Sequence, residues 1–171
     1  RDRSPSRGLG DVYKRQLSFI IDEGYKRGMS IVLNPSPINE KIFECDLEKL
    51  EYLILNEIEA ADILGASDTG EDELIEKLTK RFPGMKIVLT LGEKGSVYVD
   101  KTQKIRQEIY KADVVDTTAA GDTFTGYFIA GIVAGIDVAG SLKQAAGAAS
   151  ITVSRKGASP SIPFAREVCE R

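Results

Sequence analysis

The run of residues 115–126 combines residue types that suit chemistry on a phosphate. Two carboxylates, Asp116 and Asp122, flank small residues, and an apolar stretch typical of a buried helix follows at 127–134. The run therefore predicts a loop that opens a helix, where free backbone N–H groups and the helix dipole favour a bound anion. Asp122 carries the same charge as such an anion. Its predicted role is to accept a proton beside it, which indicates phosphoryl transfer to a hydroxyl.

Composition excludes several other chemistries. The chain has 171 residues, a formal net charge of −3 and no histidine. The lack of histidine excludes Ser-His-Asp and Cys-His nucleophiles and all His-ligated metal sites. Cys45 and Cys169 fit no redox or metal motif, which is typical of a reduced, cytoplasmic protein. The chain lacks the strong basic excess that would indicate nucleic-acid binding. No apolar run reaches the length needed to span a membrane. We expect small-molecule partners, with neither nucleic acid nor a membrane.

Residues 1–16 are expected to lie outside the native fold. They contain five basic and two acidic residues without periodicity, and the sequence at 11–16 resembles the translation of a sequencing-library adapter. We predict that this segment is adapter-derived, a disordered native tail being the alternative. Residues 17–171 are then predicted to be the C-terminal part of a longer, single-domain protein.

Hydrophobic periodicity over the remaining chain predicts strands that alternate with helices. Helices are predicted at 17–28, 57–64, 72–81, 121–134 and 138–154, with a short one at the end, and strands at 31–33, 53–55, 86–91, 95–100 and 104–109. Continuous apolar strands between helices predict an α/β fold with a mostly parallel sheet covered on both faces. Ligands of such sheets bind at the carboxyl ends of strands, where Asn34, Asn56 and Gly92 fall.

Two polar segments at those strand ends each have two interpretations. Residues 90–95, Thr-Leu-Gly-Glu-Lys-Gly, fit a tight turn between strands, or a backbone that a nucleotide can approach closely. Residues 56–59, Asn-Glu-Ile-Glu, fit an N-cap with acids in the first helical turn. Alternatively, Asn56 and Glu59 face nucleotide phosphates through magnesium-bound waters, because magnesium tends to keep its waters.

The irregular segment 155–163 also has two interpretations. It is either a surface loop with basic tips, or a cation site made by its carbonyls and the Ser161 hydroxyl. Asp116 and Thr118 would supply further oxygen atoms. A monovalent ion at this place would hold the preceding loop in shape without touching substrate.

Residues 116–124, Asp-Thr-Thr-Ala-Ala-Gly-Asp-Thr-Phe, resemble the signature of ribokinase-like (PfkB-type) carbohydrate kinases. Segments 34–37, 56–59, 90–95 and 155–158 follow in the family's order, and together they are most similar to the ribokinase branch. The resemblance covers residues 17–171, roughly the C-terminal half of such an enzyme. It implies a three-layer α/β/α fold with a mostly parallel sheet, from which the N-terminal part and the lid are missing.

The resemblance also implies an activity. The expected reaction is ATP-dependent transfer of the γ-phosphoryl group to a primary sugar hydroxyl, with ribose as the first expected acceptor and ribose 5-phosphate as product. A PfkB-type kinase for fructose, deoxyribose or a nucleoside is the alternative. Asp122 is implied to be the catalytic base, and the N–H groups of Ala120, Gly121 and Asp122 to form an anion hole.

The implied cofactors are ATP, Mg²⁺ and K⁺. Residues implied to bind the nucleotide are Asn56, Glu59, Thr90, Leu91, Gly92, Glu93, Lys94, Gly95, Gly121, Asp122 and Ala146, with Glu59 reaching magnesium through water. Residues implied to ring potassium are Asp116, Thr118, Thr152, Arg155, Gly157 and Ser161, of which Thr152, Arg155 and Gly157 use backbone carbonyls. Ala146 departs from a common pattern, since relatives often have Asn or His there beside the adenine.

The family's sugar-binding residues and lid belong mostly to the N-terminal half. We therefore expect this chain alone to be inactive and to expose apolar surface that promotes aggregation, and the full-length parent to be a homodimer. Two other interpretations are a non-catalytic relative and a truncated product without function. The presence of Gly121 and Asp122 disfavours the first, whereas the adapter-like start favours the second.

Overall fold

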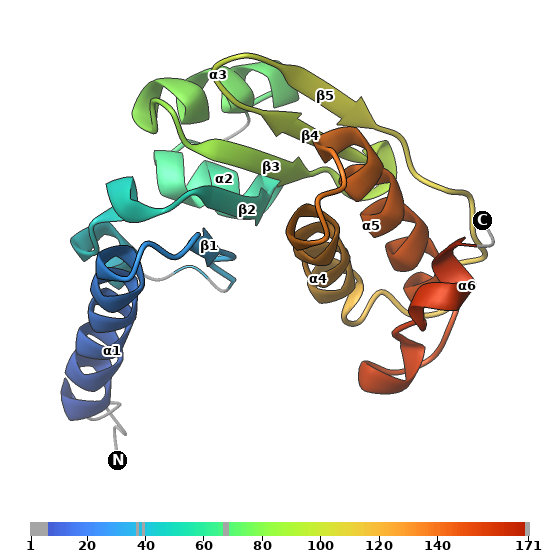
Figure 1. The fold of residues 1–171 in the computed structure, drawn as a ribbon, viewed down its shortest axis with the longest axis horizontal. Helices are drawn as coiled ribbons and strands as arrows, with labels where there is room; N and C mark the ends of the chain where they lie inside the picture. Colours follow the sequence, from blue (N-terminus) through green and yellow to red (C-terminus); the bar gives the residue numbers. More distant parts are fainter. Residues whose placement is uncertain (1–6, 37, 39, 67–68, 170–171) are drawn as a thin grey trace. The chain divides into compact units, whose positions relative to one another are not determined.

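The computed structural model describes residues 7–36, 38, 40–66 and 69–169 (Figure 1). Pro37, the last residue of the 34–37 motif, lies outside them. The chain divides into two compact units, Arg1–Ile87 and Val88–Arg171, which are described separately below. Within the described residues, no helix is long and apolar enough to cross a membrane.

The first unit contains short strands and the helices that cover them. Its elements are α1 (Arg7–Lys26), β1 (Val32–Leu33), the 3₁₀ helices η1 (Glu40–Glu44) and η2 (Leu47–Lys49), β2 (Tyr52–Asn56), α2 (Glu57–Leu64), α3 (Glu71–Arg81) and the start of β3 (Lys86–Thr90). Strands β1 and β2 pair in parallel, with Val32 opposite Tyr52. Helix α1 begins ten residues before the expected Leu17, since extending an existing helix requires far less free energy than starting one.

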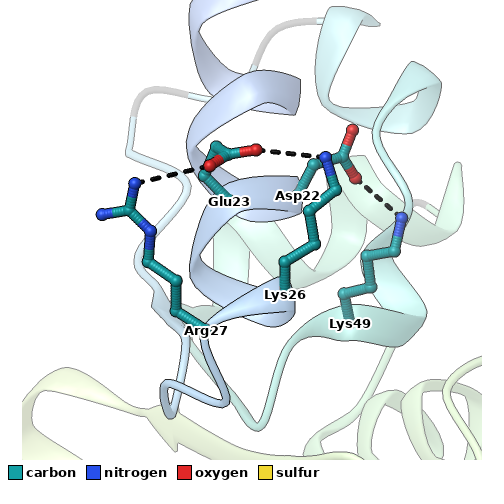
Figure 2. Close-up of polar contacts among 5 residues, drawn as sticks. All are labelled: Asp22, Glu23, Lys26, Arg27 and Lys49. Carbon is teal, nitrogen blue, oxygen red and sulfur yellow. Dashed lines mark hydrogen bonds and ion pairs between the residues drawn. The ribbon is translucent and has the colours of Figure 1, made fainter.

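An ion pair joins α1 to the 3₁₀ helix η2 (Figure 2). Lys49 Nζ of η2 lies 2.7 Å from Asp22 Oδ1 of α1 and 3.0 Å from Asp46 Oδ2, and the contacts with Asp22 and then Asp46 raise the pKa of Lys49 to about 12. Glu23 of α1 pairs with Lys26 of the same helix at 3.1 Å and with Arg27, just after the helix, at 3.5 Å. Such exposed pairs contribute little stability, so Ile21, which is buried, is the main anchor among the α1 side chains that the structure describes. Phe19, Ile20 and Tyr25 of α1 are exposed.

The second unit places two long helices beside a β-hairpin. Its elements are the end of β3, η3 (Gly92–Lys94), β4 (Ser96–Val99), β5 (Lys104–Gln107), α4 (Ala120–Val133), α5 (Val138–Val153), η4 (Ser159–Ser161) and α6 (Ala165–Cys169). Strands β4 and β5 are antiparallel, as expected, with Ser96 opposite Gln107. Helices α4 and α5 pack side by side (Figure 1).

The strands form one mixed sheet in the order β1-β2-β3-β4-β5. Side chains along β2 and β3 are buried at consecutive positions, for example at Leu53–Leu55 and Ile87–Leu89. Burial on both faces is what a continuous apolar strand between helices predicts. The expected α/β class is confirmed.

Candidate functional site

The loop before α4 leaves backbone amides free at the helix start. Ala119, the N-cap of α4, has a left-handed backbone with φ 61°, and it is the one non-glycine residue with positive φ among the described residues. Its carbonyl accepts the first helical hydrogen bond, from Thr123 N at 2.9 Å. In the described part of the chain, the amides of Gly121 and Asp122 donate no hydrogen bond to protein. Two N–H groups therefore point out of the positive end of a 14-residue helix, an arrangement that favours anions.

The third amide that the sequence assigned to the anion hole is engaged. Ala120 N donates to Thr117 O at 3.2 Å, which closes a turn ahead of the helix. The candidate anion hole in this structure therefore has two free amides, those of Gly121 and Asp122.

Asp122 occupies the third position of α4, and its side chain is exposed. Among the described residues its carboxylate has neither an ion-pair nor a hydrogen-bond partner. A carboxylate without a partner, next to free amides, is available to take a proton from a hydroxyl that approaches a bound phosphate.

Asp116 connects this loop to the segment that follows α5. Its Oδ1 accepts a hydrogen bond from Thr118 N and its Oδ2 accepts one from Gly157 N, both at 2.9 Å. Hydrogen bonds from Thr118, and then from the Gly157 amide, lower the pKa of Asp116 to about 2. The loop is thus held by a carboxylate that stays ionised at neutral pH.

The segment after α5 is rich in oxygen atoms and is internally bonded. The Thr152 carbonyl accepts a hydrogen bond from Arg155 N at 3.1 Å, and Ser161 Oγ, on a fully buried residue, donates to Ala158 O at 2.6 Å. Gly157 has φ 92°, which turns its N–H toward Asp116. A carboxylate, carbonyls and hydroxyls are hard oxygen ligands, so the donor set suits a hard cation. No group of three or more carboxylate, thiol or imidazole ligands occurs in the described residues.

A buried pair of hydroxyls holds the start of α4 against the end of α5. Thr152 Oγ1 donates to Thr123 Oγ1 at 3.2 Å, and both residues are almost fully buried. Further along the helices, a Cβ added at Gly131 would lie 2.6 Å from Ser141 Oγ, so glycine allows the close approach. These contacts fix Asp122, which is adjacent to Thr123, relative to Thr152.

Residues 90–95 form a tight turn between β3 and β4. Gly92 and Gly95 both have positive φ, and Leu91 N donates to Gly95 O at 2.8 Å. A Cβ on Gly95 would lie 2.1 Å from Gln107 O, so only glycine fits. The tight-turn interpretation is confirmed. Leu91 is buried, so any contact of this residue with a nucleotide would involve its backbone.

Asn56 and Glu59, in the first unit, cap α2. Asn56 Oδ1 accepts from Glu59 N and Glu59 Oε2 accepts from Asn56 N, each at 2.9 Å, which is a complete capping box. The capping interpretation is confirmed. A carboxylate oxygen can accept more than one hydrogen bond, so Glu59 retains the capacity to meet a magnesium-bound water. The magnesium role stays a prediction, and so does the nucleotide contact of Ala146, a largely buried residue of α5.

Sequence reasoning missed Glu167 of α6. Glu167 Oε1 accepts from Arg155 at 2.5 Å and Oε2 accepts from Phe164 N at 2.7 Å. The Arg155 contact first, and then the Phe164 amide, lower the pKa of Glu167. The available signal was a glutamate at the third residue of a helix, a position from which it can cap the backbone N–H of the residue before the helix.

Comparison with known proteins gives a consistent result. Residues 17–165 match the pfkB family carbohydrate kinase profile. The chain is 36% identical over 144 residues to a ribokinase of Staphylococcus aureus, a match that covers 82% of this chain and 47% of the relative. It is also 30% identical over 155 residues to a deoxyribokinase of Salmonella typhi, a match that covers 90% of this chain and 51% of that relative.

Solved structures give the same fold. The structure of Arabidopsis thaliana ribokinase complexed with ribose and ATP matches with a TM-score of 0.77 and 31% identity, over 88% of this chain and 50% of that one. The three-layer α/β/α expectation is thereby confirmed. The chain spans about half the length of the relatives it matches.

Proposed function

Because the chain belongs to the pfkB family of carbohydrate kinases, we propose that it carries the phosphoryl-transfer half of an ATP-dependent sugar kinase. The observation that carries this proposal is the unpartnered Asp122 carboxylate beside the two free amides that begin α4. The γ-phosphoryl group of ATP moves to a primary sugar hydroxyl, and ADP leaves.

The proposed mechanism assigns separate tasks to the start of α4. The N–H groups of Gly121 and Asp122 hydrogen-bond phosphoryl oxygens as negative charge redistributes during transfer. The Asp122 carboxylate accepts the hydroxyl proton while the sugar oxygen bonds to phosphorus and the bond to the ADP oxygen breaks. A positioned base of this kind typically contributes about 10²–10⁴-fold, and each preorganised donor about 10²–10³-fold.

We propose that nucleotide and metal use follow the family. Solved relatives include a ribokinase with ATP and ribose and another with ADP, which supports ATP use here. The backbone at residues 90–95 and the α5 residue Ala146 are proposed to contact the nucleotide. Asn56 and Glu59 are proposed to hold waters of a magnesium ion, which would neutralise phosphate charge.

We further propose a structural potassium ion near Asp116. Its oxygen donors are the residues predicted above: Asp116, Thr118, Thr152, Arg155, Gly157 and Ser161. Support comes from the hard-oxygen donor set and from the Asp116–Gly157 hydrogen bond, which joins the two segments that supply it. The ion would keep the loop before α4 in shape, so activity is expected to rise with potassium and to fall when sodium replaces it.

Ribose is the proposed acceptor, since the ribokinase match is 36% identical. Deoxyribose is the second candidate, supported by the 30% match to a deoxyribokinase. The chain by itself is proposed to lack turnover. The complete enzyme is proposed to be a cytoplasmic homodimer.

A chimera tests the proposal. The N-terminal half of the Staphylococcus aureus ribokinase is joined to Leu17, and ATP consumption is measured with ribose, deoxyribose and fructose. We expect turnover with potassium, with ribose preferred. Asp122→Asn in the same chimera should bind ATP normally and lose most turnover. A folded chimera without activity, or an active Asp122→Asn variant, would refute the proposal or the base assignment, respectively.

A further inference from the structure

The short helix α6 makes polar contacts on both sides of the segment that follows α5. Glu167 accepts a hydrogen bond from the Arg155 guanidinium at 2.5 Å, near the beginning of that segment. Glu167 accepts a second hydrogen bond, at 2.7 Å, from the backbone N–H of Phe164, just beyond the end of the 155–163 segment. One carboxylate therefore holds two points of the chain that are nine residues apart in sequence.

Helix α6 is itself anchored in the second unit. Val168, adjacent to Glu167, packs in a buried cluster with Ala148 and Ile151 of α5, and Tyr127 of α4 packs against the cluster. Tyr127 OH donates to Pro163 O at 2.7 Å. These contacts restrict the position from which Glu167 acts, because its neighbour cannot move without opening the cluster.

The segment that Glu167 holds donates one backbone N–H to the loop before α4. Gly157 lies between Arg155 and Phe164 and donates its N–H to Asp116 Oδ2, whose Oδ1 accepts from Thr118 N. A hydrogen bond to a carboxylate depends on donor direction as well as distance. A shift of the 155–163 segment would thus change the support of the loop before α4.

We propose that Glu167 is a positioning residue for the loop that opens α4. By holding Arg155 and the Phe164 backbone, it orients Gly157 N toward Asp116 and so shapes the Asp116–Ala119 turn. The contacts stand without any assumed activity; the consequence for phosphate binding rests on the proposed function. Glu167 touches no reacting atom and acts through Asp116.

Amide hydrogen exchange, followed by ¹⁵N NMR on this chain, tests the positioning role. Glu167→Gln removes the charge that pairs with Arg155 but leaves an acceptor for Phe164 N. We expect exchange at Gly157 and Thr118 to become about fivefold faster, the upper end of the effect of losing a partly exposed ion pair. Exchange at Val97 and Tyr98 of β4 should stay unchanged, because those amides report the stability of the hairpin.

Glu108→Gln is the matched control, since Glu108 also pairs with an arginine, Arg106, at 3.2 Å in the second unit. In Glu108→Gln, the amide exchange rates of Gly157 and Thr118 should stay within about twofold of those in the wild type. Arg155→Gln should reproduce the Glu167→Gln effect, and the double variant should add little to either. Unchanged exchange at Gly157 and Thr118 in Glu167→Gln would overturn the proposal, as would a uniform increase that includes Val97.

Titration with inorganic phosphate separates this proposal from the proposed function. In the wild type, phosphate should shift the amide resonances of Gly121 and Asp122, and Glu167→Gln should weaken that binding several-fold while Glu108→Gln should not. If the wild type shows no shift there, the anion hole of the proposed function fails, and the exchange data alone decide the role of Glu167. Equal phosphate binding by the wild type and Glu167→Gln would overturn the proposed effect of Glu167 on the loop before α4.

Discussion

The Asp116 carboxylate accepts a hydrogen bond at 2.9 Å from the backbone N–H of Gly157, a residue 41 positions later in the chain. The same carboxylate holds Thr118 N, so it joins the loop before α4 to the segment after α5. The left-handed backbone of Gly157 directs its N–H to this contact. The start of α4 is thus shaped by residues well outside its own signature.

Replacing Ala119 by glycine is expected to stabilise the protein. Ala119 is held at φ 61°, where a Cβ costs about 1–2 kcal/mol, whereas glycine adopts this conformation freely. The larger entropy of glycine in the unfolded chain offsets part of this gain. We therefore expect the free energy of unfolding, measured by urea denaturation, to rise by about 0.5–1 kcal/mol. Ala130→Gly, at an exposed position inside α4, is the control and should destabilise by about 1 kcal/mol. A loss of stability in Ala119→Gly would contradict the left-handed assignment.

Two glycines of the turn between β3 and β4 should respond differently to alanine. A Cβ at Gly95 would lie 2.1 Å from the Gln107 carbonyl oxygen, whereas a Cβ at Gly92 meets nothing within 4 Å. Gly92, at φ 56°, has a left-handed backbone that alanine can adopt at a modest cost, whereas Gly95, at φ 90° and ψ −136°, lies in a region that is accessible essentially to glycine alone. The clash and the larger backbone cost therefore add at Gly95. We expect Gly92→Ala to lower the free energy of unfolding by about 1–2 kcal/mol and Gly95→Ala by at least about 3 kcal/mol. Equal losses in thermal or urea unfolding would rule out the close contact.

The buried hydroxyl pair of Thr123 and Thr152 should show strong coupling. Thr123→Val leaves the Thr152 hydroxyl buried without its partner, which costs about 1–3 kcal/mol. The double valine variant removes both hydroxyls while keeping their shape. Its loss should therefore be clearly smaller than the sum of the single losses. A double-mutant cycle on unfolding free energies measures this, and additive losses would show that the hydroxyls do not interact.

Acid should weaken the β4–β5 hairpin through Asp100. Burial alone would raise the pKa of Asp100, but hydrogen bonds from Tyr98 OH at 2.7 Å, Thr102 N at 2.7 Å and Gln103 N at 2.9 Å outweigh it and hold the pKa well below its usual 3.8. A lowered folded-state pKa contributes stability above the unfolded pKa, and this contribution is lost as pH falls below about 4.

Urea denaturation between pH ~6 and pH ~2.5 checks the Asp100 prediction. The wild type should lose stability more steeply below pH ~4 than Asp100→Asn, which has no carboxylate to protonate at this position. Asp113→Asn, a change at an exposed aspartate in the same unit, is the control and should follow the wild type. Parallel curves for the wild type and Asp100→Asn would contradict a role for this carboxylate in acid sensitivity.

Elements with strong local signals were predicted closely. Helix α2 was expected from Glu57 to Leu64 between Asn56 and Gly65, and the structure has those bounds because the capping box and the left-handed glycine act within the helix itself. Helix α1 was expected ten residues too short, and the 3₁₀ helices were not predicted. Short i→i+3 segments have no hydrophobic period that would reveal them.

The sequence predicted which residues belong to the candidate site more accurately than it predicted the hydrogen bonds between them. The run from Asp116 to Asp122 was expected to open a helix, and α4 begins at Ala120. The hydrogen bond from Ala120 N to Thr117 O was not expected, since it depends on the left-handed turn at Ala119. Glu167 was missed because its partner Arg155 lies twelve residues earlier, beyond any helical spacing.

By itself, the sequence determined the family, the order of the strands and helices along the chain, and the placement of Asp122 in a first helical turn. These depend on periodicity, caps and small residues, which act over a few positions. Only the tertiary structure decided that Gly157 bonds to Asp116, Thr152 to Thr123 and Glu167 to Arg155. Each of those bonds joins segments that are distant in sequence. Their geometry is therefore set by how α4, α5 and α6 pack within the second unit.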